Sequence, residues 1–139
     1  MPSPLSDFEQ TLKKHHQNST AARRKVFTTL QEADPMTMSE LVTACSPDIN
    51  RSSVYRTVEL FEKLGIILRI QIGWKYKLEL SEPYQQHHHH MYCTQCANTY
   101  SVPEDTMLET RLHALATHAG FIPESHQIEI TGTCASCTL

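Results

Sequence analysis

The chain has 139 residues, 40% of them hydrophobic, and a formal net charge of −3, which suits one domain or two small ones with a modest core. It has no apolar run near the roughly 18 residues of a membrane span, and its first residues lack the pattern of a signal peptide. We therefore expect a cytoplasmic protein with no membrane partner.

The charges are unevenly distributed. Residues 1–82 carry 11 Lys and Arg against 10 Asp and Glu, whereas residues 83–139 carry one Arg, five acids and seven of the nine histidines. This asymmetry predicts one part that faces an anionic partner and another that holds metal.

The first part predicts four short helices followed by a hairpin. Apolar residues recur at helical spacing, and three of the four sets follow a Ser, Thr or Asn that can cap a helix: Phe8 and Leu12; Val26, Phe27 and Leu30 after Ser19-Thr20; Met38, Leu41, Val42 and Cys45 after Thr37 or Ser39; Val54, Val58, Phe61 and Leu64 after Asn50 or Ser52. Gly65 is placed to end the fourth helix.

Two strands are then predicted, at 66–72 and 75–80, with Gly73-Trp74 as their turn and Trp74 as a packing residue. Helices followed by a two-stranded hairpin are typical of a winged helix-turn-helix.

After a hinge at residues 83–86, we expect a strand through the histidines, a strand at 99–102, a helix at about 103–119 and a strand at 127–131. The predicted fold class is therefore α+β. A winged helix-turn-helix over 1–82 would precede a small C-terminal α/β domain over 87–139.

Two C-x-x-C pairs, Cys93 with Cys96 and Cys134 with Cys137, can supply the four thiolates of a tetrahedral zinc site. In a cytoplasmic protein such pairs indicate metal ligands before disulfides, although two disulfides in an exported protein are the alternative. The fifth cysteine, Cys45, lies on an apolar helix stripe and is predicted to be a buried thiol.

Four consecutive histidines precede the first cysteine pair. Because side chains alternate along a strand, His87 and His89 would point to one face and His88 and His90 to the other. This alternation predicts two further metal sites. Imidazoles with few carboxylates favour zinc over iron(II) and manganese, while nickel stays open.

The fourth helix opens with residues that can read DNA. In a helix-turn-helix the N-terminal residues of the recognition helix approach the base edges. The residues predicted to do so are Arg51, Ser53, Tyr55 and Arg56. Phosphate or minor-groove contacts are predicted for Lys14, Arg23 and Lys75. A winged helix that serves only protein contacts is the alternative.

Taken together, Ser53-Val54-Tyr55-Arg56-Thr57, the histidine run before Cys93-x-x-Cys96, and Gly132-Thr133-Cys134-x-x-Cys137 resemble the ferric uptake regulator family. The resemblance covers nearly the whole chain. It implies a homodimeric, metal-responsive transcriptional repressor with a DNA-binding winged helix and a C-terminal dimerisation domain. Such a protein would bind a double-stranded DNA operator, take no small-molecule substrate and not be an enzyme.

The resemblance also implies three metal sites in this chain. A structural zinc would be held by Cys93, Cys96, Cys134 and Cys137. A site in the dimerisation domain would use His87, His89, Glu109 and His126. A regulatory site between the domains would use Glu79, His88 and His90.

The chain departs from the family pattern at three positions that bear on metal choice. Met36 lies in the region where the family's DNA-domain histidine is expected, Ser101 replaces a carboxylate, and His89 stands where many iron-type members have aspartate. The loss of oxygen ligands at Ser101 and His89 brings the ligand set closest to the zinc-uptake regulators. The cofactors predicted are thus a structural Zn²⁺ and a second, regulatory divalent metal, with Zn²⁺ favoured over Fe²⁺ and Mn²⁺.

Other functions remain open at this point. An iron-, manganese- or peroxide-responsive regulator of the same family is the nearest alternative. A metal store or chaperone would account for the histidines but not for the winged helix. A zinc enzyme would need an open coordination position with a general base, and the sequence lacks an H-E-x-x-H pattern.

Overall fold

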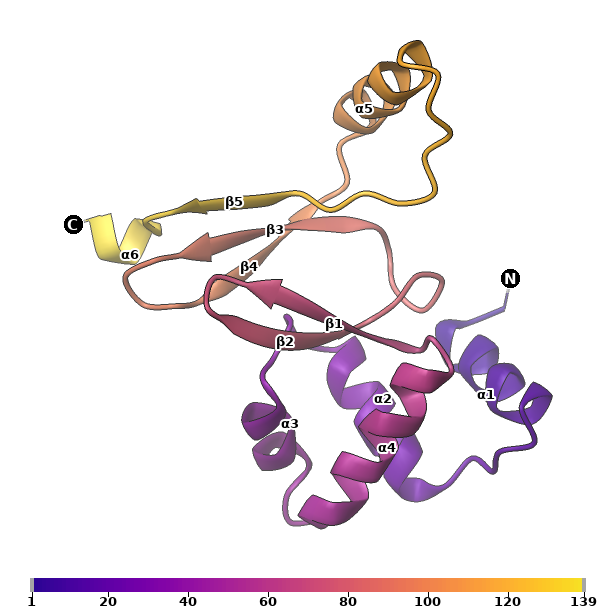
Figure 1. Ribbon diagram of the computed structural model, residues 1–139. Helices are drawn as coiled ribbons and strands as arrows, with labels where there is room; N and C mark the ends of the chain where they lie inside the picture. Colours follow the sequence, from indigo (N-terminus) through magenta and orange to yellow (C-terminus); the bar gives the residue numbers. More distant parts are fainter. Residues whose placement is uncertain (1, 139) are drawn as a thin grey trace. The chain divides into compact units, whose positions relative to one another are not determined.

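The computed structural model describes residues 2–138, which form two compact units divided between Gln86 and His87. The N-terminal unit contains four helices and a hairpin (Figure 1). Its elements are α1 (Pro4–Lys14), α2 (Ala21–Gln31), α3 (Met38–Cys45), α4 (Arg51–Lys63), β1 (Ile67–Ile72) and β2 (Lys75–Leu80). Strands β1 and β2 pair antiparallel, so the unit is a winged helix-turn-helix, as predicted.

The helix starts are determined by side-chain caps. Thr20 and Asn50 each accept a hydrogen bond from the backbone N–H three residues later, and so does Thr37. Glu40 returns a bond to the Thr37 backbone at 3.0 Å, which completes a capping box. Of the alternatives left open by the sequence, Thr37 and Asn50 are the caps.

Gly65 ends α4 in the predicted way. Its φ of 72° lies in the left-handed region that favours glycine. The N–H of Ile66 donates to the Phe61 carbonyl at 2.8 Å and that of Gly65 to the Glu62 carbonyl at 3.2 Å. These two bonds form a Schellman motif, which turns the chain directly from α4 into β1.

The core of this unit is built on three phenylalanines from three helices. The Phe8 ring stacks on Phe27 with centroids 4.2 Å apart and meets Phe61 edge-on at 5.4 Å. Tyr84 adds an edge contact to Phe27 at 5.8 Å, and its hydroxyl lies 2.7 Å from that of Thr11. Tyr84 falls in the segment predicted as a hinge, so at least this residue packs into the N-terminal core.

The prediction that Trp74 packs at the turn is wrong, because its side chain is 96% exposed. Gly73 has a φ of 60° and begins a two-residue turn between Ile72 and Lys75, the last pair of the hairpin. Trp74 is the second turn residue and extends beyond that pair, where the hairpin offers nothing to cover it.

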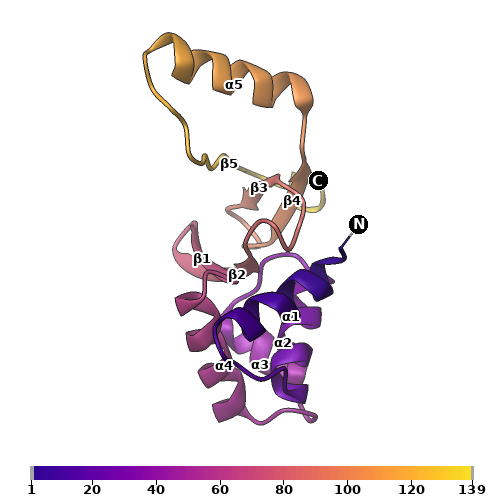
Figure 2. The same ribbon diagram turned by 90° about the vertical axis from the view of Figure 1, so that its right-hand side faces the viewer.

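The C-terminal unit is a three-stranded sheet with a long helix set apart from it (Figure 2). Its elements are β3 (His88–Cys93), β4 (Thr99–Pro103), α5 (Thr106–His118), β5 (Glu129–Gly132) and α6 (Ala135–Thr138). The central strand β3 pairs antiparallel with β4 and parallel with β5. The last strand begins two residues later than predicted, and α5 begins at Thr106 because Asp105 caps it.

Helix α5 has no buried residue. Leu108 and Leu115, on its predicted apolar face, are 40% and 55% exposed.

Within residues 2–138, no helix has the length and apolar character needed to cross a membrane.

Candidate metal centres

The four paired cysteines gather at one end of the C-terminal sheet. The parallel register of β3 with β5 sets Cys93 opposite Gly132, so Cys134 follows directly beside the first pair. The sulfurs of Cys96 and Cys134 are 3.8 Å apart, and all four sulfurs lie within 4.8 Å of one another. A tetrahedral zinc with Zn–S bonds of about 2.3 Å requires sulfurs about 3.8 Å apart. The spacing therefore fits zinc.

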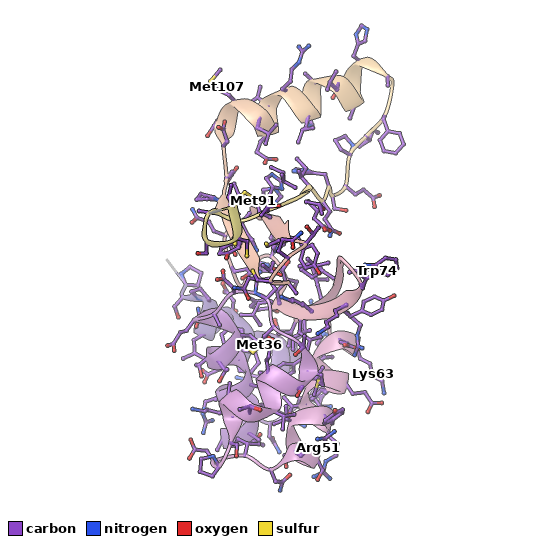
Figure 3. The ribbon with its side chains drawn as sticks, turned by 90° about the vertical axis from the view of Figure 1, so that its left-hand side faces the viewer. Met36, Arg51, Lys63, Trp74, Met91 and Met107 are labelled. Carbon is purple, nitrogen blue, oxygen red and sulfur yellow. The ribbon has the colours of Figure 1, made fainter. Side chains whose placement is uncertain are left out.

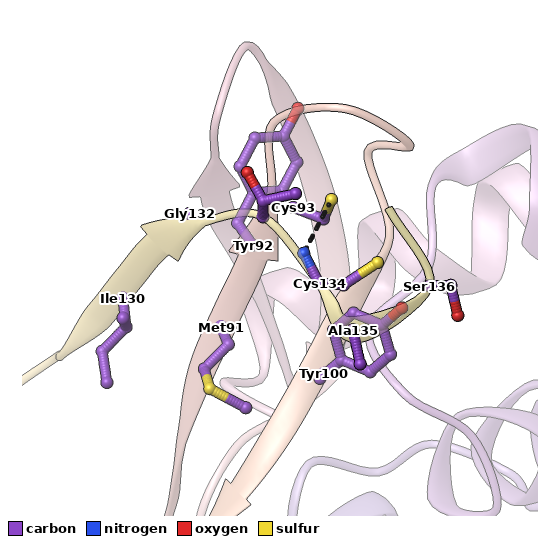
Figure 4. Close-up of a pocket in the computed structure, with 10 residues that line it drawn as sticks. Met91, Tyr92, Cys93, Tyr100, Ile130, Gly132, Cys134, Ala135 and Ser136 are labelled. Atoms are coloured by element: carbon purple, nitrogen blue, oxygen red, sulfur yellow. Dashed lines mark hydrogen bonds between the residues drawn. The ribbon is translucent and has the colours of Figure 1, made fainter. Parts of the chain in front are cut away.

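Backbone amides prepare one of these sulfurs for a cation. The N–H of Cys134 donates to the Cys93 sulfur at 3.3 Å (Figure 4). Together with the N–H groups of Cys96 and Gln95, this bond lowers the pKa of Cys93 to about 6. Hydrogen bonds to the thiolate favour the charged form, which is the form that binds metal.

The other sulfurs show why the cluster needs a cation. Hydrogen bonding to the neighbouring Cys134, burial and the other nearby sulfurs raise the pKa of Cys137 to about 12. Four sulfurs so close together cannot all ionise unless a positive charge is bound among them. The donor set thus fits a divalent metal, which would supply that charge and join the two cysteine pairs.

Tyr100 on β4 is a part of this centre that the sequence did not indicate. Its hydrogen bond to the Cys134 thiol is the main cause of the lowered pKa of Cys134. Both residues line a pocket of about 430 Å³ beside the cluster, together with the apolar side chains of Met91 and Ile130 (Figure 4). In the sequence, Tyr100 lies four residues after Cys96, but this spacing does not reveal its contact with Cys134. That contact depends on how the strands pair.

A second cluster joins β3 to α5 through one carboxylate. Glu109 contacts the Nε2 atoms of three histidines: it lies 2.6 Å from His126, 3.4 Å from His87, and in a short hydrogen bond with His89. One nitrogen or oxygen from each of the four residues lies within 4.8 Å of the others. Three imidazoles and a carboxylate are a suitable ligand set for zinc and other first-row divalent metals.

The carboxylate of this cluster is held in its charged form. Burial raises the pKa of Glu109, but the hydrogen bond from His89 and the charges of the nearby imidazoles outweigh it, so that pKa lies below its ordinary value. His89 is 3% exposed, and its Nδ1 atom is buried without a hydrogen-bond partner. Glu109 therefore offers an anionic group to this cluster, and its hydrogen bond with His89 tethers α5 to the sheet.

Replacing Glu109 with glutamine is expected to weaken metal binding at this cluster by at least about 10-fold, because shape is kept while the only negative charge is lost. Equilibrium dialysis against cobalt(II), followed by its visible absorption, measures the occupancy. His113→Ala, which removes an exposed imidazole one turn further along α5, is the matched control. Equal cobalt affinity in the Glu109→Gln variant and the wild type would remove Glu109 from the ligand set.

The remaining two histidines of the run point the other way. The Nε2 atoms of His88 and His90 are 3.1 Å apart, and His90 is 4% exposed. On the adjacent strand, Ser101 lies directly opposite His90. The alternation predicted from the sequence is thus present in β3. Glu79, the third residue predicted for this site, is a buried residue of β2 in the N-terminal unit.

The residues predicted to contact DNA lie on three helices and the hairpin of the N-terminal unit. Lys14, Arg51, Tyr55, Arg56 and Lys75 are exposed, and Arg23 and Ser53 are half-buried.

The Arg51 guanidinium donates to the Tyr55 hydroxyl at 3.1 Å and lies 5.1 Å from the centre of the ring. This contact orients both side chains at the start of α4, where a recognition helix meets base edges.

Cys45 is buried as predicted, and burial raises the pKa of its thiol.

A winged helix joined to a unit with a four-cysteine cluster and a histidine run defines a class of protein, the metal-binding transcriptional regulators. The model of the ferric uptake regulator family matches residues 14–131, and the chain belongs to that family. Proteins of this family are transcriptional regulators and not enzymes.

Relatives of known function and known structure agree with this assignment. The ferric uptake regulation protein of Bordetella parapertussis is 30% identical over 139 residues, covering 96% of this chain and 97% of that protein. The crystal structure of the Vibrio cholerae ferric uptake regulator superposes with a TM-score of 0.72 at 27% identity, covering 92% of this chain and all of that one. The Helicobacter pylori regulator superposes with a TM-score of 0.78 at 20% identity, over 98% of this chain and 92% of that one.

Proposed function

We propose that this protein is a metal-dependent transcriptional repressor that binds operator DNA as a homodimer and responds to zinc. The observation that carries the proposal is the separation of ligand types. Four thiolates form a closed cluster suited to a permanent zinc, whereas the imidazoles form separate groups suited to exchangeable metal. A repressor acts on the chromosome, so we also propose a cytoplasmic location.

Exposed apolar side chains of the C-terminal unit support the homodimer. Large side chains at least 37% exposed occur on α5, on the segment after it and on the sheet: Met91, Tyr100, Met107, Leu108, Leu115, Phe121, Ile122 and Ile130. Large apolar side chains exposed in this number indicate an interface, and a second copy of the same chain is the commonest partner in a symmetric regulator.

Light scattering on the metal-loaded protein tests this part of the proposal. The expected mass is twice the 15.9 kDa of one chain, with two chains bound to one operator duplex. A metal-loaded monomer that binds DNA at full affinity would contradict the homodimer.

For the regulatory metal, we propose His88 and His90 as two of the ligands. Their 3.1 Å separation is close to the spacing of about 3.3 Å expected for two nitrogens bound at about 2.0 Å to one tetrahedral ion. Glu79 remains the third ligand predicted from the sequence. Helicobacter pylori Fur has three functional metal-binding sites, which is the number of sites we propose here.

Ser101 supports the preference for zinc. It faces His90 across the strand pair, where Cβ atoms are about 5 Å apart, and it offers a neutral hydroxyl. Manganese and iron(II) gain more from carboxylate oxygens than zinc does, whereas imidazole suits zinc. A site with two imidazoles and a neutral neighbour therefore favours zinc.

Ser101→Asp is expected to raise manganese affinity about 10-fold relative to zinc affinity, because it adds a carboxylate beside His90. Competition titrations with a chromogenic chelator measure both metals on the same preparation. Ser101→Asn, which matches the new side chain in size but lacks its charge, is the control. An unchanged ratio of the two affinities in Ser101→Asp would separate Ser101 from metal selection.

An iron- or manganese-responsive regulator is the second candidate. The 30% identity to the Bordetella parapertussis ferric uptake regulation protein favours it. DNA-binding titrations with zinc, iron(II) and manganese, each added separately, distinguish the two.

A further inference from the structure

The tip of the β1–β2 hairpin carries an aromatic side chain that the winged helix does not use for packing. Trp74 is 96% exposed, and Tyr76, two residues on, is 57% exposed. Trp74 is also the only tryptophan of the chain. Tryptophan side chains contribute strongly to interfaces because they bury a large, rigid surface.

The tip of the hairpin is positively charged. Residues 70–78 contain two lysines and no aspartate or glutamate, and of these lysines Lys77 is buried. Lys75 is exposed directly beside Trp74. An aromatic ring flanked by a lysine is suited to a polyanion that also presents flat or apolar surface, and duplex DNA is such a polyanion.

The hairpin is fixed on the side of the recognition helix. Arg69 on β1 donates to Glu62 on α4, with a shortest distance of 2.7 Å. Figure 3 shows Trp74 on the same side of the N-terminal unit as Arg51 and Lys63, the first and last residues of α4. Figure 2 likewise shows the hairpin turn on the side that α4 occupies.

The reach of the hairpin matches the geometry of DNA. Strand β1 ends at Ile72, the third residue after Arg69, which sets the turn about 10 Å beyond the ion pair. A recognition helix centred in a major groove about 12 Å wide lies a comparable distance from the flanking backbone and the minor groove beyond it.

We propose that Trp74 is a DNA-contact residue that lies against the sugar–phosphate edge of the minor groove next to the major groove read by α4. Lys75 pairs with a phosphate at the same place. This contact is independent of base sequence, so it adds affinity and positions the recognition helix. The inference rests on the proposed DNA binding of the whole protein.

The fluorescence of Trp74 tests the contact directly, because no other tryptophan contributes. In the metal-loaded protein we expect the emission of a fully hydrated indole. Saturation with a duplex from the promoter of its own gene is expected to shift that emission to shorter wavelength and to reduce quenching by acrylamide. Fluorescein-labelled duplex, followed by anisotropy in parallel, shows independently that DNA is bound.

Substitutions complete the test. Trp74→Ala is expected to raise the Kd at least about 5-fold, by the same factor on the promoter and on a random duplex, and Trp74→Phe should recover part of the loss. Leu5→Ala, which trims a partly exposed apolar residue on α1, is the control and should bind like the wild type.

Two results overturn the inference. If the labelled duplex binds while Trp74 emission, acrylamide quenching and the affinity of Trp74→Ala stay unchanged, the wing contact is absent and the proposed function stands. If no duplex binds at any metal concentration, the proposed function fails and the wing contact fails with it.

Discussion

Cys96→Ser is expected to lower the zinc affinity of the cysteine cluster about 100- to 1,000-fold and to unfold the C-terminal unit. Structural zinc binding in small domains contributes about 10–16 kcal/mol, so one of four thiolates accounts for roughly 3–4 kcal/mol. The unit has little else to stabilise it: among residues 87–138, Cys93 is the only buried hydrophobic residue. Without the metal, the sheet has no core of its own.

The measurements are zinc content after dialysis, thermal unfolding by circular dichroism, and limited proteolysis. Proteolysis is expected to cut after residue 87 and to leave the winged helix intact, since that unit has its own phenylalanine core. Cys45→Ala is the matched control, because Cys45 is the one cysteine outside the cluster. It should keep its zinc. A Cys96→Ser protein that retains one tightly bound zinc and melts like the wild type would contradict the structural assignment.

The second large effect is expected from His90→Ala, which should abolish the metal response of DNA binding while the fold and dimer remain. Even residues that only support a metal ligand alter affinity 10- to 100-fold, so removal of a ligand should cost at least about 100-fold. A ligand shifts a conformational equilibrium only by its differential affinity for the two states. A protein that cannot hold the regulatory metal therefore stays in its weakly binding state.

DNA affinity with and without added zinc measures this effect by anisotropy. His90 is 4% exposed, so His90→Gln, which fills more of the space, separates loss of a ligand from loss of packing. His118→Ala, on an exposed position of α5, is the control and should respond like the wild type. The assignment of His90 fails if both His90 variants keep the full zinc response.

Local patterns in the sequence were enough to predict much of the fold. The helix caps at Thr37 and Asn50 and the stop at Gly65 depend only on residues three or four positions away. The two-faced arrangement of the histidines follows from strand periodicity alone. These features need no knowledge of the tertiary structure, which is why they could be predicted.

Features that depend on distant pairing could not be predicted in this way. The register of β3 with β4 decides that Ser101 faces His90, and the position of Tyr100 beside Cys134 depends on the same sheet. Neither relation leaves a mark at short range in the sequence.

Trp74 was mispredicted for another reason. Hydrophobicity favours burial, but a two-residue turn fixes the side chain outside the hairpin whatever its polarity.

We propose that an exchangeable metal controls the DNA affinity of this regulator. Wild-type protein that keeps its structural zinc but has been stripped of exchangeable metal tests this control. Zinc, iron(II) and manganese are then added separately, without oxygen and at one fixed salt concentration, to fluorescein-labelled promoter DNA. We expect zinc to restore tight binding at the lowest free metal concentration. Equal DNA affinity with and without every metal, in protein that remains folded, would contradict it.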